Sequence, residues 1–141
     1  MSDSKNTKEI SRKEGEKKKK ILISDPEPFI RDTLKIKFAS KGYQVIMANT
    51  GRDTVRMAAK HTPAIILMEI DYQDLDGFRI CQLLKGHKTT AHIPIVVLTK
   101  LDDTPERRFT FGPYVKEFMT KPFSPREVAR ATERVIREEQ K

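Results

Sequence analysis

The stretch Pro63-Ala-Ile-Ile-Leu-Met-Glu69 is an apolar run that ends in a carboxylate, and it decides the fold of this chain. A second acidic stretch, Asp74-Leu-Asp76-Gly77-Phe78, follows it and opens an amphipathic helix that extends to about residue 86. A short continuous apolar run suits a parallel strand that is covered on both faces. We therefore expect a buried strand over residues 64–69, with a polar group at its carboxyl end and a helix beginning near Asp76.

The same alternation of apolar run and amphipathic helix extends in both directions from this stretch. Apolar runs predict further strands at 21–23, 44–48, 93–98 and 115–119, and helical spacing of apolar residues predicts helices at about 28–41, 52–61 and 124–139. Ser124, just before Pro125, is expected to cap the last helix. Five successive strand–helix units imply an α/β fold, a doubly wound five-stranded parallel sheet with helices on both faces.

Composition favours one small globular domain. The chain has 141 residues, of which 37% are hydrophobic and 34% are charged. Its longest apolar stretches are shorter than the roughly 18–20 residues that cross a bilayer. The single cysteine, Cys81, excludes an internal disulfide framework and fits the reducing cytosol, so we expect a cytoplasmic protein with a buried structural thiol.

The net charge of +8 is concentrated near the N-terminus, where residues 1–20 carry eight lysines and arginines against four acids. Residues 1–17 have too few apolar side chains to offset the entropy of ordering, so we expect a disordered basic arm before a folded domain over 18–141. The arm could bind nucleic acid or an anionic membrane surface through its charge. The sequence favours a solvated tail over nucleic-acid binding, because no recognition helix accompanies the arm.

Polar residues follow four of the predicted strands. In a doubly wound parallel sheet the functional crevice lies beyond the carboxyl ends of the strands. The side chains expected to meet there are Asp25, Glu27, Glu69, Thr99 and Lys121.

The order of these residues resembles that of the receiver domains of response regulators, a family with a flavodoxin-like (βα)5 fold. The matching segments are Lys19-Lys-Ile-Leu-Ile-Ser-Asp25-Pro-Glu-Pro28, Thr99 and Lys121-Pro122-Phe123, and Phe118 stands where a switch aromatic is usual. The resemblance covers about residues 19–138. It implies a non-enzymatic bacterial signalling domain of the two-component or phosphorelay type, with Thr99, Phe118 and Lys121 as switch residues and Pro122 as a candidate cis proline.

Two departures from the family pattern stand at the phosphorylation site. The resemblance implies a phosphoacceptor aspartate where this chain has Glu69, and a second acid of the Mg²⁺ site where it has Pro26. Proline offers no side-chain oxygen, and Mg²⁺ demands nearly octahedral oxygen ligation. We therefore expect no tightly held cofactor, at most a weak Mg²⁺ site formed by Asp25, Glu27 and Glu69, and a loss of phosphotransfer.

Two hypotheses describe the role of Glu69. A Glu69 carboxylate paired with Lys121 would act as a permanent, weak imitation of the phosphorylated state, or it would be an inert remnant of the acceptor. An alternative hypothesis keeps phosphorylation and uses Asp71 as the acceptor, with Asp25 and Glu27 holding the metal.

The resemblance also implies that a protein partner binds the surface formed by the helix after Thr99, the strand at 115–119 and the last helix. Pro105 and Gly112-Pro113 restrict that helix to about two turns. The candidate contact residues there are Arg107, Arg108, Phe111 and Tyr114, because arginine and aromatic side chains supply binding hot spots. Phe109 is expected in a repacked core, and the protein is expected to be a monomer or a weak dimer.

Overall fold

The computed structural model describes residues 18–140 of the chain. The predicted disordered arm over 1–17 lies outside the described residues. Within the described part, no helix combines the length and the apolar character that crossing a membrane requires.

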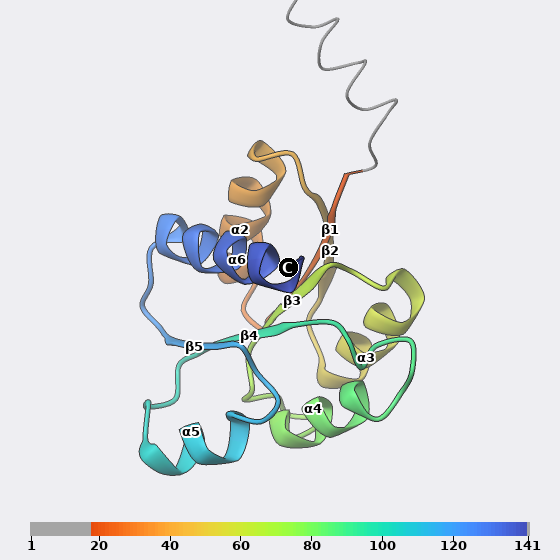
Figure 1. The fold of residues 1–141 in the computed structure, drawn as a ribbon. Coiled ribbons are helices and arrows are strands. Elements are labelled where there is room, and N and C mark those ends of the chain that lie inside the picture. Colours follow the sequence, from red (N-terminus) through yellow and green to blue (C-terminus); the bar gives the residue numbers. More distant parts are fainter. Residues whose placement is uncertain (1–17, 141) are drawn as a thin grey trace, which may run out of the picture.

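Five parallel strands form a single sheet with the order β2-β1-β3-β4-β5. The strands are β1 (Lys20–Ser24), β2 (Gln44–Ala48), β3 (Ile65–Met68), β4 (Ile95–Thr99) and β5 (Glu117–Thr120). The helices are α2 (Pro28–Ser40), α3 (Gly51–His61), α4 (Gly77–Lys85), α5 (Pro105–Phe111) and α6 (Pro125–Glu139). The predicted fold class is confirmed: α2 and α6 cover one face of the sheet, and α3, α4 and α5 cover the other (Figure 1).

The core is divided by the sheet into two clusters of buried side chains. Leu34 and Phe38 of α2 pack with Val128 and Val135 of α6 on one face. The other face is filled by α3, α4 and α5, where Cys81 is fully buried as expected. Burial raises the pKa of the Cys81 thiol to about 12, so it stays protonated and unreactive at neutral pH.

Local sequence signals place most of the helix ends. Ser124 caps the start of α6, as predicted, and it forms a reciprocal capping box with Glu127. Gly42 follows α2 with a φ of 93°, a left-handed conformation that favours glycine. Asp76 stands at the N-cap of α4, but its side chain makes no capping hydrogen bond.

The expected start of the fifth strand at residue 115 is wrong by two positions. The backbone N–H of Val115 donates to the carbonyl of Phe111 at 3.0 Å, so this residue still belongs to the turn that closes α5. Lys116 is the first residue to bond to the neighbouring strand, through the carbonyl of Ile95 at 2.8 Å. The apolar run in the sequence therefore begins before the strand does.

The two phenylalanines of α5 lie opposite to their predicted places. Phe111 is buried with 7% exposure and joins the core, whereas Phe109 is 85% exposed. The prediction of Phe109 as a core residue is therefore wrong, and Phe111 is not available as an exposed contact residue. Residues two apart on a helix face different sides, and the ring of Phe111 packs edge-on against Phe78 of α4, with centroids 6.2 Å apart.

Candidate functional site

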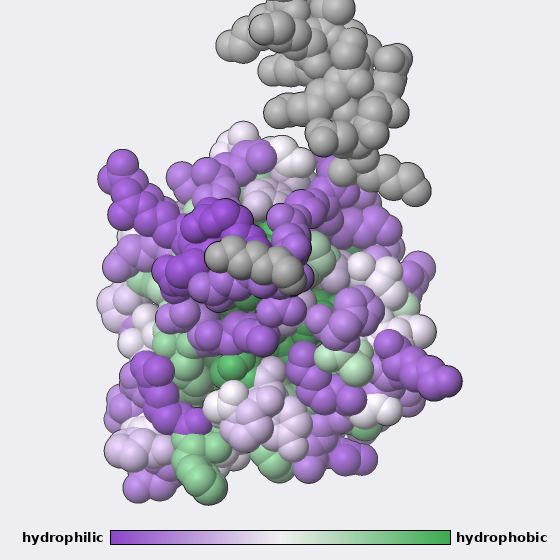
Figure 2. Space-filling view, viewed as in Figure 1, coloured by the Kyte–Doolittle hydropathy of each residue, from purple (hydrophilic) through white to green (hydrophobic). Residues whose placement is uncertain are grey.

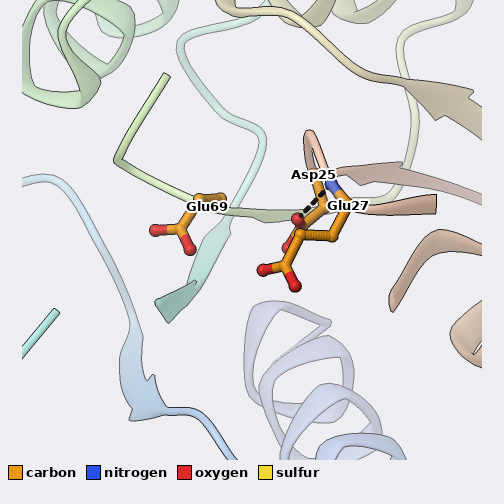
Figure 3. Close-up of side chains that lie close together, drawn as sticks. All are labelled: Asp25, Glu27 and Glu69. Atoms are coloured by element: carbon orange, nitrogen blue, oxygen red, sulfur yellow. Dashed lines mark hydrogen bonds between the residues drawn. The ribbon is translucent and has the colours of Figure 1, made fainter. Parts of the chain in front are cut away.

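The ammonium group of Lys121 lies among three carboxylates at the carboxyl end of the sheet. Its Nζ atom is 2.9 Å from Oδ2 of Asp25, 2.7 Å from Oε2 of Glu27 and 3.1 Å from Oε1 of Glu69. Figure 3 shows the three acids, with Asp25 and Glu27 in the turn after β1 and Glu69 across from them after β3. The ends of β1, β3 and β5 thus bring these four residues to one place.

The turn after β1 is built around Asp25, which is 1% exposed. Its Oδ1 atom accepts a hydrogen bond from the backbone N–H of Glu27 at 2.9 Å, and its carbonyl accepts one from Nη1 of Arg31 at 2.7 Å. Pro26, between the two acids, is exposed and has no N–H to donate. The turn therefore points one acid into the site from each side of the proline.

Glu69 is also 1% exposed, and both of its carboxylate oxygens accept hydrogen bonds. Oε2 accepts from the backbone N–H groups of Ile70 at 2.7 Å and Asp71 at 3.2 Å, and Oε1 accepts from that of Lys100 at 3.1 Å. With the ammonium of Lys121, four donors surround one carboxylate. Charge-assisted hydrogen bonds of this kind hold a side chain in a single position.

Thr99 is fully buried at the end of β4, yet its hydroxyl is directed to its own loop. Oγ1 of Thr99 accepts from the backbone N–H of Leu101 at 3.1 Å, and the structure gives it no hydrogen bond to Glu69. The backbone carbonyl of Thr99 accepts a hydrogen bond from the backbone N–H of Lys121 at 2.7 Å. Thr99 therefore connects the loop after β4 to β5, whereas Lys121 contacts the three acids.

Two further residues named from the sequence lie in β5 and just after it, Phe118 and Pro122. Phe118 is buried with 7% exposure, and its ring packs on Phe111 with centroids 6.3 Å apart. The peptide bond between Lys121 and Pro122 is cis.

The pKa values of the cluster reflect burial and the shared lysine. Burial raises the pKa of Asp25, although the hydrogen bond from Lys121 opposes this change. The hydrogen bond from Lys121 lowers the pKa of the exposed Glu27. For Lys121, burial alone would lower the pKa, but the hydrogen bonds to Asp25 and Glu27 outweigh it and the pKa is raised.

Asp25, Glu27 and Glu69 are also the residues of the cluster that could hold a metal ion, with ligand oxygens within 4.8 Å of one another. An oxygen of each faces the Lys121 ammonium, which stands where the three acids converge. A divalent cation would compete with this ammonium for the carboxylate oxygens and would find no ligand at Pro26. The set fits a Mg²⁺ ion poorly, and a weak site stays a prediction.

Asp71, the alternative acceptor, lies on the rim of a cavity of about 480 Å³ beside Glu69. Its carboxylate is 44% exposed and is 3.3 Å from Nζ of Lys100. Asp71 thus does not join the three acids around Lys121.

Two further features of the site were missed from the sequence. The hydroxyl of Tyr72 is hydrogen-bonded to Oγ of Ser24 at 2.6 Å, and Ser24 is hydrogen-bonded in turn to Thr54, which ties the loop after β3 to β1 and α3. Asp74 accepts from the backbone N–H groups of Gly51 at 2.8 Å and Arg52 at 3.0 Å. No periodic pattern identifies such loop contacts, because they join segments far apart in the chain.

Comparison with known proteins identifies the family of this chain. The model of the response regulator receiver domain family matches residues 21–133. This chain belongs to that family. It is 33% identical over 119 residues to the alkaline phosphatase synthesis transcriptional regulatory protein PhoP of Bacillus subtilis, a match that covers 84% of this chain and 49% of the relative. A probable transcriptional regulator, ycf27 of Pyropia yezoensis, is 31% identical over 85% of this chain and 48% of its own length. The receiver domain thus spans about half the length of these curated relatives.

Solved receiver domains share the fold. The receiver domain of a sensor histidine kinase from Pseudomonas aeruginosa, solved with a magnesium ion in its active-site cleft, superposes with a TM-score of 0.76. It is 24% identical to this chain, and the match covers 84% of this chain and 98% of that domain. This likeness shows the fold, whereas the match to the family over residues 21–133 identifies the chain as a receiver domain of two-component signalling.

Proposed function

We propose that this receiver domain signals by phosphorylation-independent contact with a protein partner, with Glu69 standing permanently in the place of the phosphorylated acceptor. The observation that carries the proposal is the set of four donors on the Glu69 carboxylate, from Lys121 and from the backbone N–H groups of Ile70, Asp71 and Lys100.

These donors are the groups that an incoming phosphoryl oxygen would need. A phosphoryl group carries nearly two negative charges and requires hydrogen bonds or cations around its oxygens. In this site the ammonium and the three N–H groups are already engaged by Glu69. The chain therefore has neither a free set of donors nor, at Pro26, a ligand for the metal that would assist the transfer.

The Glu69 carboxylate is connected to α5 and β5 by its contacts with Lys100 and Lys121. Oε1 of Glu69 accepts from the N–H of Lys100, at the start of this loop, and pairs with Lys121 at the end of β5. The loop leads to α5, whose first turn is capped by Thr104. Glu69 thereby links β3 to both sides of the α5–β5 surface, where the proposed contact residues Arg107, Arg108 and Tyr114 lie.

The proposal predicts a specific response to Glu69→Gln, which removes the charge and keeps the length of the side chain. The ion pair with Lys121 is lost, so the amide hydrogens of Thr99 and Phe118 should exchange faster than in the natural protein. Hydrogen exchange with residue resolution is the measurement, and Glu133→Gln is the control, because Glu133 pairs with Lys41 at the surface, 3.2 Å away.

The competing hypothesis treats Glu69 as an inert remnant. In that case Glu69→Gln relieves repulsion among the acids, the fold becomes more stable, and exchange at Phe118 is unchanged. That combination would overturn the proposed role of Glu69 and leave the receiver assignment intact.

A further inference from the structure

An apolar groove lies between α4 and α5 and is bordered by the most exposed phenylalanine of the described residues. The groove has a volume of about 600 Å³. Phe78 and Tyr114 line it with rings at right angles, 5.5 Å between centroids, and Phe109 borders it with 85% exposure. Figure 2 shows hydrophobic residues at the surface over the position of α5 in Figure 1.

Arg108 lines the same groove and is held rigidly. Its Nε and Nη2 atoms donate to the two carboxylate oxygens of Asp103 at 2.7 Å and 2.6 Å. Its guanidinium carbon lies 5.7 Å from the centre of the Phe118 ring, within the range of a cation–π contact. The side chain is nevertheless 57% exposed. A rigid and accessible guanidinium loses little entropy when it binds a second anion.

One edge of this guanidinium is open. A guanidinium has five N–H donors, and two of them are directed at Asp103. Within residues 18–140 the structure gives the Nη1 atom of Arg108 no partner. The edge formed by Nη1 and Nη2 matches the two oxygens of a carboxylate.

We propose that this groove binds a segment of a partner protein that places an acidic side chain next to a bulky apolar one. The apolar side chain would pack on Phe78, Phe109 and Tyr114, and the carboxylate would take the open edge of Arg108. The inference deepens the proposed function and rests on it, since it names the chemistry of the partner and adds the α4–α5 groove to the contact surface.

Charge argues against the two occupants that the chain itself could supply. Residues 1–20 carry eight basic and four acidic side chains, so the basic arm is a poor ligand for an arginine. A second copy is disfavoured because a net charge of +8 opposes self-association. An acidic–apolar segment of another protein meets both requirements of the groove.

A displayed library of random twelve-residue peptides, selected against the full-length chain, tests the proposal. The selected peptides should be enriched in aspartate or glutamate beside leucine, isoleucine, phenylalanine or tryptophan. A synthetic copy of the tightest peptide should bind Arg108→Gln and Phe109→Ser each about tenfold more weakly than the natural chain in fluorescence anisotropy.

Matched variants elsewhere on the surface serve as controls. Arg56→Gln removes another surface arginine that pairs with an aspartate, Asp53, and Phe29→Ser removes another exposed phenylalanine, at 76%. Both should bind the peptide like the natural chain. Peptides without an acid, no enrichment, or affinity unchanged in Arg108→Gln would overturn the proposal.

Two further outcomes separate this inference from related ideas. Self-association that Phe109→Ser abolishes, measured by sedimentation, would assign the groove to a second copy and overturn the proposal. Peptide affinity that is weakened by Arg108→Gln and unchanged by Glu69→Gln would support peptide binding in the groove. The role of Glu69 is tested separately, by the hydrogen-exchange measurement.

Discussion

At the scale of single residues, Lys121 controls the charge of the site. It is the only cation within ion-pair distance of Asp25 and Glu69 among the described residues, and its side chain is 10% exposed. Buried acids without a counter-charge are costly, because they lose hydration and repel one another. The stability of this end of the sheet therefore depends on one ammonium group.

Replacing this lysine gives a prediction with a definite pH dependence. Lys121→Met should destabilise the fold at neutral pH by about 3 kcal/mol, because it leaves buried acids unpaired. The pKa of Asp25, which burial already raises, should rise further, because the hydrogen bond from Lys121 that opposes this change is lost. A raised pKa in the folded state favours folding at low pH and loses that contribution as the pH rises.

The variant should therefore gain stability when the pH falls from about 7 to about 5, which urea unfolding at both pH values measures. Lys41→Met, which removes an exposed partner of Glu133, is the control and should change stability little. A Lys121→Met protein as stable as the natural one at neutral pH would show that the cluster does not need its cation.

At the scale of elements, the order of strands and helices is predictable because apolar residues recur at regular spacing. Single contacts between side chains of different elements follow no such pattern and were not predicted. Strand and helix order follow from apolar runs and spacing, and Ser124, Pro125 and Gly42 mark element ends through their own backbone preferences. Phe109 and Phe111 could not be assigned from a two-turn helix, because the choice depends on the position of Phe78 on another element.

In the candidate site, too, one feature was predictable from the sequence and another was not. The convergence of Asp25, Glu27, Glu69 and Lys121 was predictable because all four follow strands of one parallel sheet. The position of the Thr99 hydroxyl was not, since it depends on how the following loop turns back.

The cap that Asp74 provides for α3 gives a prediction at this scale. Asp74→Ala should destabilise the protein by about 1 kcal/mol, because Gly51 and Arg52 lose their hydrogen-bond acceptor. The hydrogen bonds from these backbone N–H groups lower the pKa of Asp74, so its contribution is present above pH 3.8 and is lost as the pH falls.

Thermal or urea unfolding at neutral and acid pH measures this difference. Asp76→Ala is the matched control, because Asp76 stands at the N-cap of α4 without a side-chain capping bond. Equal effects of the two substitutions would contradict the assigned role of Asp74.

At the scale of the whole molecule, a receiver fold surrounds a Glu69 carboxylate that already engages the Lys121 ammonium and three backbone N–H groups. The family match agrees with the five-stranded parallel sheet of this chain. The resemblance to the family pattern implies that Glu69 and Pro26 replace the aspartate nucleophile and a metal ligand. The central claim is therefore that the domain does not take up a phosphoryl group.

Intact-mass spectrometry after incubation with acetyl phosphate and Mg²⁺ tests this claim most directly. We predict that the natural chain gains no phosphoryl group, whereas a double variant with Pro26→Asp and Glu69→Asp gains one. A phosphoryl adduct on the natural chain that forms only with Mg²⁺ would contradict the account, and its location on Asp71 would establish the alternative acceptor.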